Sequence, residues 1–145
     1  MMKKFELMTE SKMNVFGKTL FRIRALVDFS FVKAGDVGGW IEEEGNLSQS
    51  GNAWVYGDAW VCGNAEVYGN DDYTTIKGFG TCFRTTTFFR CKDKTVKVAC
   101  GCFLGTIAEF RKQVKRTRSG KIAKEYLMIA DLMEMHFKEG EDEQY

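Results

Sequence analysis

Hydrophobic and polar residues alternate with a six-residue period in the middle of the chain. A glycine recurs at every sixth position, and an Asn or Asp follows the last five of these glycines. The glycines are Gly39, Gly45, Gly51, Gly57, Gly63 and Gly69, and the residues that follow them are Asn46, Asn52, Asp58, Asn64 and Asn70. A small apolar residue comes next, and Val55, Val61 and Val67 stand two positions further on. Gly, Asn and Asp tolerate tight corners, so the pattern predicts short strands with one buried face, joined by corners.

This order of residues resembles the hexapeptide repeat of left-handed β-helix proteins, most clearly in the stretch GNAWVY-GDAWVC-GNAEVY. The resemblance implies a mainly β fold with some α. Its centre would be a short left-handed parallel β-helix over residues 39–72, with about two coils when three units complete a turn. So short a solenoid needs caps or a partner copy, and proteins of this kind commonly form trimers. We therefore expect a homo-oligomer, with a trimer favoured.

Four large aromatic residues stand at the positions of the repeat that are predicted to point outward. They are Trp54, Tyr56, Trp60 and Tyr68. An aromatic surface of this size needs a cover. We expect self-association through these residues, because Trp and Tyr are enriched at interfaces. Packing against the second module of the same chain and a sugar-stacking surface are the alternatives.

Residues 1–38 are predicted to form an N-terminal β cap over the open end of the repeat. Strand-like stretches occur at Lys4–Met8 and Thr19–Phe29, and the polar segment between them is interpreted as a connection. In the second stretch apolar Phe21 and Ile23 alternate with arginines, as in a strand with one buried face.

A different module is predicted over residues 76–139, with Gly78–Gly80 as a linker and an acidic tail at residues 140–145. Its β-hairpin turns at Lys92–Lys94. Pairing Cys91 with Val96 would give a core face and a basic face. The core face would hold Phe83, Thr85, Thr87, Phe89, Cys91, Val96, Val98, Cys100 and Cys102, and the basic face Arg84, Thr86, Phe88, Arg90, Lys97, Ala99 and Phe103.

Two helices are predicted to complete this ββαα module. Thr106 and Glu109 have the spacing of a capping box at the start of the first helix. Ile107, Phe110 and Val114 share one face of this helix. The second helix is predicted over Ile122–Phe137, with apolar residues at helical spacing.

The net charge of +1 conceals four segregated blocks of charge. Residues 1–40 carry +3, residues 41–75 carry −7, residues 76–124 carry +11 and residues 125–145 carry −6. Basic residues interleaved with aromatic ones favour a phosphate-bearing partner. The predicted binding residues are Arg84, Arg90, Lys97, Arg111, Lys112, Lys115, Arg116 and Arg118. The alternative is that the acidic segments neutralise this surface within the molecule or the oligomer.

Candidate catalytic chemistry is sparse. His136 is the single histidine of the chain, and it lies in the second predicted helix rather than in the repeat. Hexapeptide acyltransferases generally use a histidine on or beside the coils, so we carry over no catalytic residue and expect neither enzymatic activity nor a cofactor. Cys82, Cys91, Cys100 and Cys102 lack the spacing of a zinc site, and buried free thiols are the preferred interpretation. No run approaches the ~18 apolar residues of a membrane span.

Over nearly its whole length the chain resembles a family encoded mostly by phages and prophages of Gram-positive bacteria. The matching stretches are Phe21–Leu26, Val32–Glu42, the GNAxVx units, Thr85–Phe89, Cys100–Phe103 and Ala123–Leu127. The resemblance brings no established activity. It leads to the hypothesis of a non-enzymatic anti-defence protein in the host cytoplasm, which binds a nucleoprotein effector, as an anti-CRISPR does, or a signal nucleotide.

Three alternatives stay open. The first is a structural, virion-associated protein that forms oligomers through its β-helix, and the second is a hexapeptide acyltransferase. In the third, an inhibitor uses its acidic surface to imitate DNA. The residues of this acidic surface are Glu42, Glu43, Glu44, Asp71 and Asp72.

Overall fold

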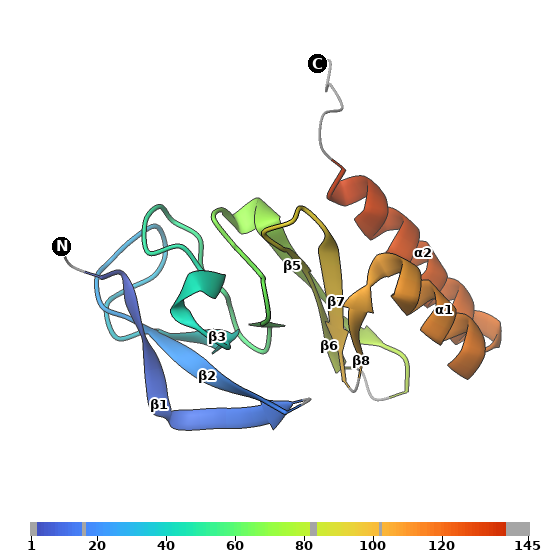
Figure 1. Cartoon of the computed structure of the whole chain (residues 1–145), viewed down its shortest axis with the longest axis horizontal. Helices are drawn as coiled ribbons and strands as arrows, with labels where there is room; N and C mark the ends of the chain where they lie inside the picture. The colour runs from blue at the N-terminus through green and yellow to red at the C-terminus, as the bar shows by residue number, and fades with distance from the viewer. Residues whose placement is uncertain (1–2, 16, 82–83, 102, 139–145) are drawn as a thin grey trace, which may run out of the picture.

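A computed structural model describes residues 3–15, 17–81, 84–101 and 103–138 of the chain. This part of the chain forms two four-stranded sheets, two short 3-10 helices and two α-helices (Figure 1). The first sheet has the order β1 (Phe5–Val15), β2 (Lys18–Ala25), β3 (Val37–Ile41) and β4 (Trp60–Val61). The second has the order β5 (Tyr73–Phe79), β6 (Arg84–Arg90), β7 (Val96–Cys100) and β8 (Phe103–Thr106). Helices α1 (Ile107–Thr117) and α2 (Gly120–His136) follow, while the 3-10 helices η1 (Glu44–Asn46) and η2 (Asn70–Asp72) precede the second sheet.

The predicted left-handed β-helix over residues 39–72 is wrong. Within the described residues, β3 and the two-residue β4 form the one parallel strand pair, and the other strand pairs are antiparallel. Hairpins take the places where further coils would stack. Strand β2 pairs with β3, and Cys91 of the second hairpin forms an isolated antiparallel bridge with Ala65. Within the repeat a further parallel contact joins Leu47 to Val67 as an isolated bridge, and antiparallel hairpins complete the sheets.

The repeat nevertheless predicts which of its small side chains are buried. The alanines and valines at the inward positions are at most 2% exposed, and they are Ala53, Val55, Ala59, Val61, Ala65 and Val67. They share a core with Phe5, Leu20, Ile23 and Ile41 of the first sheet. The repeat therefore supplies core side chains to a sheet that is closed mainly by antiparallel strands.

Asn46 joins two parts of the repeat that are distant in sequence. Its side chain is fully buried, and its Oδ1 accepts hydrogen bonds from the backbone N–H groups of Glu42 at 3.1 Å and Glu43 at 2.9 Å. Its Nδ2 donates to the carbonyls of Gly63 at 3.1 Å and Ala65 at 3.0 Å. This amide thus uses both donors and accepts twice, which offsets the cost of burying it.

The outward orientation predicted for Trp54 and Trp60 is wrong. Trp54 is 2% exposed and packs edge-on against Phe5 and Phe29, with ring centroids 6.3 and 5.4 Å away. Trp60 is 8% exposed, and its backbone N–H donates to Thr87 Oγ1 at 3.3 Å. Residues 53–58 form no regular strand, so their side chains do not alternate strictly between two faces. The chain itself covers both residues: Trp54 lies against Phe5 and Phe29 of the N-terminal segment, whereas Trp60 meets Thr87 of the second module, which was the expected alternative cover.

The N-terminal hairpin is longer than predicted. Strand β1 continues to Val15 through the segment that was interpreted as a polar connection, with a register shift between Met8 and Lys12. Its second half is largely exposed and projects as the blue ribbon in Figure 1. Met13 and Val15 alternate with exposed Lys12 and Asn14 and pack against the first core, but this alternation is too short to predict a strand by itself.

The second hairpin forms at the predicted turn, but its register differs by one residue. Arg90, rather than Cys91, pairs with Val96, so Phe88 pairs with Val98. Phe88 and Ala99, expected on a basic surface, are fully buried. Phe88 packs among the helices, whereas Phe89 and Ala99 belong to the core of the first sheet. Both faces of this sheet are covered, so hydrophobicity does not reveal which face a residue occupies. Phe83 and Cys102 of the predicted core face lie outside the described residues.

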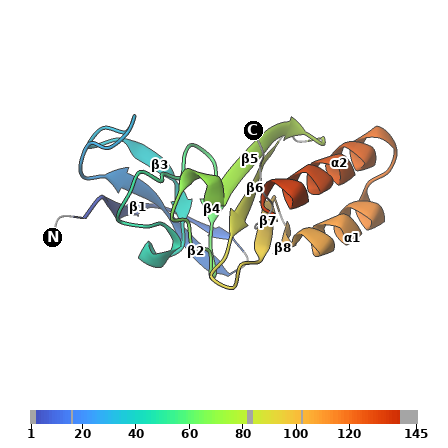
Figure 2. The same ribbon diagram turned by 90° about the horizontal axis from the view of Figure 1, so that it is seen from above.

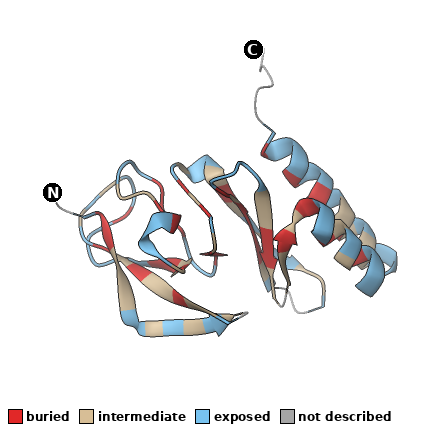
Figure 3. Ribbon diagram, in the orientation of Figure 1, coloured by how far each residue is buried: buried red, intermediate tan, exposed pale blue. Residues whose placement is uncertain are grey.

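The helices agree with the prediction and cover one face of the second sheet (Figure 2). Thr106 and Glu109 form the predicted capping box, with Glu109 N–H donating to Thr106 Oγ1 at 3.1 Å. The predicted apolar faces are buried toward the sheet, at Ile107, Phe110, Val114, Tyr126, Ile129, Ala130, Met133 and Phe137 (Figure 3). Residues 78–79, predicted as part of a linker, belong to β5. The predicted acidic tail at 140–145 lies outside the described residues.

Candidate ligand-binding site

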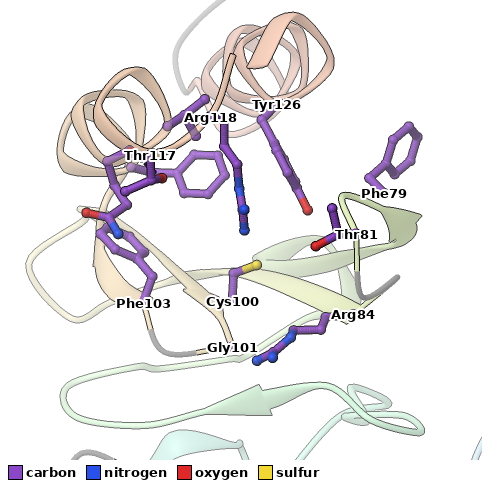
Figure 4. Close-up of a pocket in the computed structure, with 12 residues that line it drawn as sticks. Phe79, Thr81, Arg84, Cys100, Gly101, Phe103, Thr117, Arg118 and Tyr126 are labelled. Atoms are coloured by element: carbon purple, nitrogen blue, oxygen red, sulfur yellow. Dashed lines mark hydrogen bonds between the residues drawn. The ribbon is translucent and has the colours of Figure 1, made fainter. Parts of the chain in front are cut away.

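A cavity of about 210 Å³ lies between the helix pair and one end of the second sheet (Figure 4). Aromatic side chains form much of its wall, and they are Phe79, Phe103, Phe110 and Tyr126. Polar groups come from Thr81, Gln113, Thr117 and Cys100. Arg84 and Arg118 also line it, and none of the described residues around this cavity is acidic. The cavity therefore combines flat apolar surfaces with an excess of positive charge.

The two arginines approach this cavity from different elements. Arg118 is the residue that ends α1, and its backbone N–H donates to the Val114 carbonyl at 2.8 Å. Its side chain points into the cavity beside Tyr126, toward Cys100 (Figure 4). Arg84 is the first residue of β6, and it lies at the opposite rim beside Gly101. Because guanidinium groups bind carboxylate and phosphate oxygens through paired hydrogen bonds, this placement suits an anion.

Two glycines make room for the side chains that shape this site. Gly80 has a φ of +77°, and a Cβ atom there would lie 2.5 Å from the hydroxyl oxygen of Tyr126. Gly101 has a φ of +55°, and a Cβ atom there would collide with the guanidinium of Arg84. Both positions therefore need glycine for the backbone and for the space it leaves. Gly80 was interpreted as part of a linker and Gly101 was assigned no role from the sequence, so both contributions to the site were missed.

The thiols do not form a metal centre among the described residues. Cys100 is half-buried at the cavity and accepts a hydrogen bond from Thr86 Oγ1 at 3.1 Å. Cys62 and Cys91 are buried in the first core, as expected for Cys91, and burial raises the pKa of Cys62 to about 11. The pKa of Cys91 is raised for the same reason. No three His, Cys, Asp or Glu side chains in the described ranges could hold a metal ion together. Cys82 and Cys102 lie outside these ranges.

Two of the predicted phosphate-binding arginines are neutralised within the chain. Arg90 is paired with Asp72 at 3.0 Å, and both side chains are largely buried. Arg111 of α1 donates to Asp131 at 2.7 Å and to Glu134 at 2.9 Å, both on α2. The alternative of internal neutralisation therefore applies to these two residues.

The other predicted basic residues separate into two groups. Arg84 and Arg118 meet at the cavity, as described above. Lys112, Lys115 and Arg116 are exposed on α1, and Lys97 is half-buried on β7. Arg116 donates to Gln113 of the same helix. The structure thus selects two of the eight residues as a compact site and leaves most of the others on the helix surface or in ion pairs.

The predicted acidic surface is partly engaged in local structure. Glu42 Oε1 accepts from the Gly63 N–H at 2.7 Å. Asp72 accepts from the N–H groups of Tyr68 at 2.9 Å and Gly69 at 3.0 Å, in addition to its ion pair. Glu44 pairs with Lys3 at 2.8 Å, and Glu43 and Asp71 are exposed. Two of the five carboxylates, those of Glu42 and Asp72, therefore hold corners of the repeat, and the other three side chains are exposed.

His136 lies at the opposite end of α2 from the cavity. It is exposed, and its ring packs edge-on against Phe137 with 4.9 Å between centroids. None of the described residues around the cavity is a histidine. The single histidine of the chain is therefore not part of this site.

Comparisons of the chain with models of known protein families, with curated proteins and with solved structures find no match. Neither α-helix of the described chain has the length and apolar character needed to cross a lipid bilayer. What the cavity binds must therefore follow from its own geometry and charge.

Proposed function

We propose that this chain is a non-enzymatic protein that binds a nucleotide in the cavity between its helices and its second sheet. The observation that carries the proposal is the placement of Arg84 and Arg118 at opposite sides of an aromatic-lined cavity. Arginines bind phosphate oxygens, and aromatic rings stack on bases. A ligand that carries both a phosphate and a base would therefore contact the arginines and the aromatic rings of this cavity.

The engaged arginines favour a small nucleotide over a nucleoprotein or a long nucleic acid. A polyanion needs a broad basic surface. Here Arg90 and Arg111 are already paired with carboxylates. Arg84 and Arg118 line the cavity itself, where a compact anionic ligand would contact them.

The resemblance to phage proteins supplies a role for such a binder. In this proposal the chain acts in the host cytoplasm and withholds a signal nucleotide from a defence system. A protein that sequesters its ligand needs affinity but no turnover, in keeping with the absence of His, Asp and Glu from the described residues that line the cavity.

Isothermal titration calorimetry with AMP, GMP and inorganic phosphate tests this function. We expect at least one nucleotide to bind more tightly than phosphate alone, because the base adds stacking to the ionic contacts. Arg118→Gln should weaken this binding by about 10-fold or more, the scale of a lost charge-assisted hydrogen bond. Lys115→Gln is the control, since Lys115 is an exposed cationic residue of the same helix that does not line the cavity.

Two results would contradict the proposal. One is the absence of binding to any of the three probes at millimolar concentration. The other is an equal loss in the two variants, which would indicate a diffuse basic surface rather than a cavity.

Self-association is a separate proposal that now depends on fewer residues. Tyr56 and Tyr68 are 48% and 63% exposed, whereas the two tryptophans are buried within the chain. Sedimentation equilibrium of the wild type and of a Tyr56→Ser, Tyr68→Ser double variant measures this directly. A wild-type monomer at micromolar concentration would contradict self-association.

A further inference from the structure

A second cavity adjoins the proposed nucleotide site and shares part of its wall. This cavity has a volume of about 360 Å³, and Arg84 and Gly101 line both cavities. Figure 4 shows the Arg84 side chain beside Gly101 and below Cys100, whereas Arg118 reaches toward Cys100 from the helices above. Arg84 therefore stands at the boundary between two compartments.

Two tryptophans stand side by side in this second compartment. Trp40 and Trp60 are neighbours in the register of the parallel strands β3 and β4, and both line the cavity. Residues in register on adjacent strands point to the same face of a sheet, so the two indoles form one aromatic wall. Trp60 is 8% exposed and Trp40 is half-buried, so Trp40 is the more accessible of the two.

The ring of Trp40 is held in position by a neighbouring arginine. The guanidinium of Arg22 lies 4.7 Å from the centroid of this ring, and its Nη1 donates to the Gly38 carbonyl at 2.7 Å. A ring fixed in this way can stack on a base without losing further conformational freedom. The wall of this compartment is therefore preorganised for a flat ligand.

Charge in this compartment also favours an anionic ligand. Lys77 lines it together with Arg84, and its Nζ lies 3.5 Å from Asp58 Oδ2. Asp58 also lies 3.9 Å from Arg22. Two cationic side chains, Arg22 and Lys77, thus lie near the Asp58 carboxylate, and Arg84 is a further cation that lines this cavity.

We propose that the two cavities form one composite site for a dinucleotide. One base lies in the cavity beside Arg118 and Tyr126, the second lies against Trp40, and the phosphate that joins them lies at Arg84. The proposal rests on the nucleotide-binding function proposed above and names the class of ligand. A ligand with two bases would use the aromatic walls that occur on both sides of Arg84. The first cavity of about 210 Å³ alone is smaller than the ~300–1,000 Å³ typical of sites for small organic ligands.

Titrations that compare mononucleotides with dinucleotides test this composite site. The probes are AMP and GMP, the linear dinucleotides pApA and pGpG, and the corresponding cyclic dinucleotides. We expect a linear or a cyclic dinucleotide to bind at least about 10-fold more tightly than its mononucleotide, because a second stacked base is added within one molecule. Quenching of tryptophan fluorescence should accompany dinucleotide binding and should be smaller with a mononucleotide.

The Trp40→Leu variant distinguishes the contributions of the two cavities to binding. This variant should reduce dinucleotide affinity to the level of the mononucleotide and should leave mononucleotide affinity unchanged. Lys77→Gln is a second variant at an exposed ion pair, so it should keep the fold and weaken dinucleotide binding by about 3-fold. Arg118→Gln should weaken both classes of ligand.

The outcomes distinguish this inference from the function on which it rests. If mononucleotides bind and dinucleotides bind no more tightly, the composite site is wrong and the nucleotide site stands. An equal effect of Trp40→Leu on both classes of ligand, in a variant that melts like the wild type, would also overturn it. If no nucleotide of either class binds, both proposals fail.

Discussion

Arg90 on strand β6 lies over the ring of Phe137 at the end of α2, with its guanidinium carbon 5.3 Å from the ring centroid. Its Nη1 also donates to the Phe137 carbonyl at 3.2 Å, and its Nε pairs with Asp72 at 3.0 Å. This arginine joins the sheet, the last helix and the corner of the repeat. We predict that Arg90→Gln lowers the free energy of unfolding by about 3 kcal/mol, the scale of breaking a buried ion pair.

Urea unfolding followed by circular dichroism measures this change. Nucleotide affinity should be unchanged in Arg90→Gln under conditions where the variant is folded, because Arg90 does not line the cavity. Arg116→Gln, on an exposed helix surface, should change the unfolding free energy by less than about 0.5 kcal/mol. Weaker nucleotide binding without a lower free energy of unfolding would contradict this account and would indicate that Arg90 binds the ligand.

Asn46 is predicted to be the most sensitive asparagine of the repeat. In Asn46→Asp the carboxylate cannot donate to the Gly63 and Ala65 carbonyls, which leaves these groups without their present donors. We expect a loss of at least about 3 kcal/mol, since each buried unsatisfied group costs about 1–3 kcal/mol. Asn52→Asp is the matched control at an equivalent but exposed position of the repeat. Thermal unfolding of the two variants should differ clearly, and equal melting temperatures would contradict this account.

Gly101 is predicted to control ligand affinity through the position of Arg84. In Gly101→Ala the new methyl group occupies space that the Arg84 side chain fills, so the Arg84 guanidinium must leave its present position. We expect nucleotide affinity to fall by about 10-fold, as after loss of a charge-assisted contact. Gly57→Ala is the control, because Gly57 has a similar φ of +56° with no atom within 4 Å of the added Cβ. Calorimetry on both variants separates displacement of Arg84 from simple backbone strain, which both share.

The buried Lys4 is predicted to make stability depend on pH. Lys4 is 4% exposed, its Nζ donates to the Ala53 carbonyl at 2.7 Å, and burial lowers its pKa to about 8. The ordinary pKa of 10.5 applies to the unfolded chain, so between about pH 8 and 10.5 the unfolded chain binds more protons than the folded one. The contribution of Lys4 to folding therefore becomes more favourable as the pH rises through this window, by at most about 3 kcal/mol.

Comparison with Lys4→Met isolates this contribution. Burial raises the pKa of Cys62 to about 11 and that of Tyr73 to about 12, and these two groups lower stability as the pH rises. Both proteins share these effects, so they cancel in the difference. Urea unfolding from pH 7.5 to 10 should show the wild type gaining stability relative to the variant. A constant difference would show that Lys4 has an ordinary pKa in the folded chain.

Local signals in the sequence predicted local structure well. The capping box of Thr106 and Glu109, the apolar face of α2 and the turn at Lys92–Lys94 form as expected because each depends on residues close together in the chain. Burial of Val55, Val61 and Val67 also follows from the repeat. A residue's inward or outward preference can therefore be correct even when the fold that was inferred from the repeat is wrong.

Features that depend on contacts between distant segments were mispredicted or missed. The partners of the repeat are hairpins from outside it, which no repeat unit specifies. The register of β6 and β7 is ambiguous from hydrophobicity, because Phe88 and Phe89 are both buried on opposite faces. The cavity depends on Gly80 and Gly101, whose importance comes from Tyr126 and Arg84 far along the chain. The two glycines themselves were the available signal in the sequence.

The central position of the second sheet has a consequence for how the molecule unfolds. Alternate residues of β6 and β7 belong to different cores, with Phe89 and Ala99 on one side and Phe88 and Val98 on the other. Loss of these two strands would expose apolar surface in both cores at once. We therefore expect the hairpins and the helix pair to melt in a single cooperative transition, and a fragment that ends before Tyr73 to aggregate rather than fold on its own.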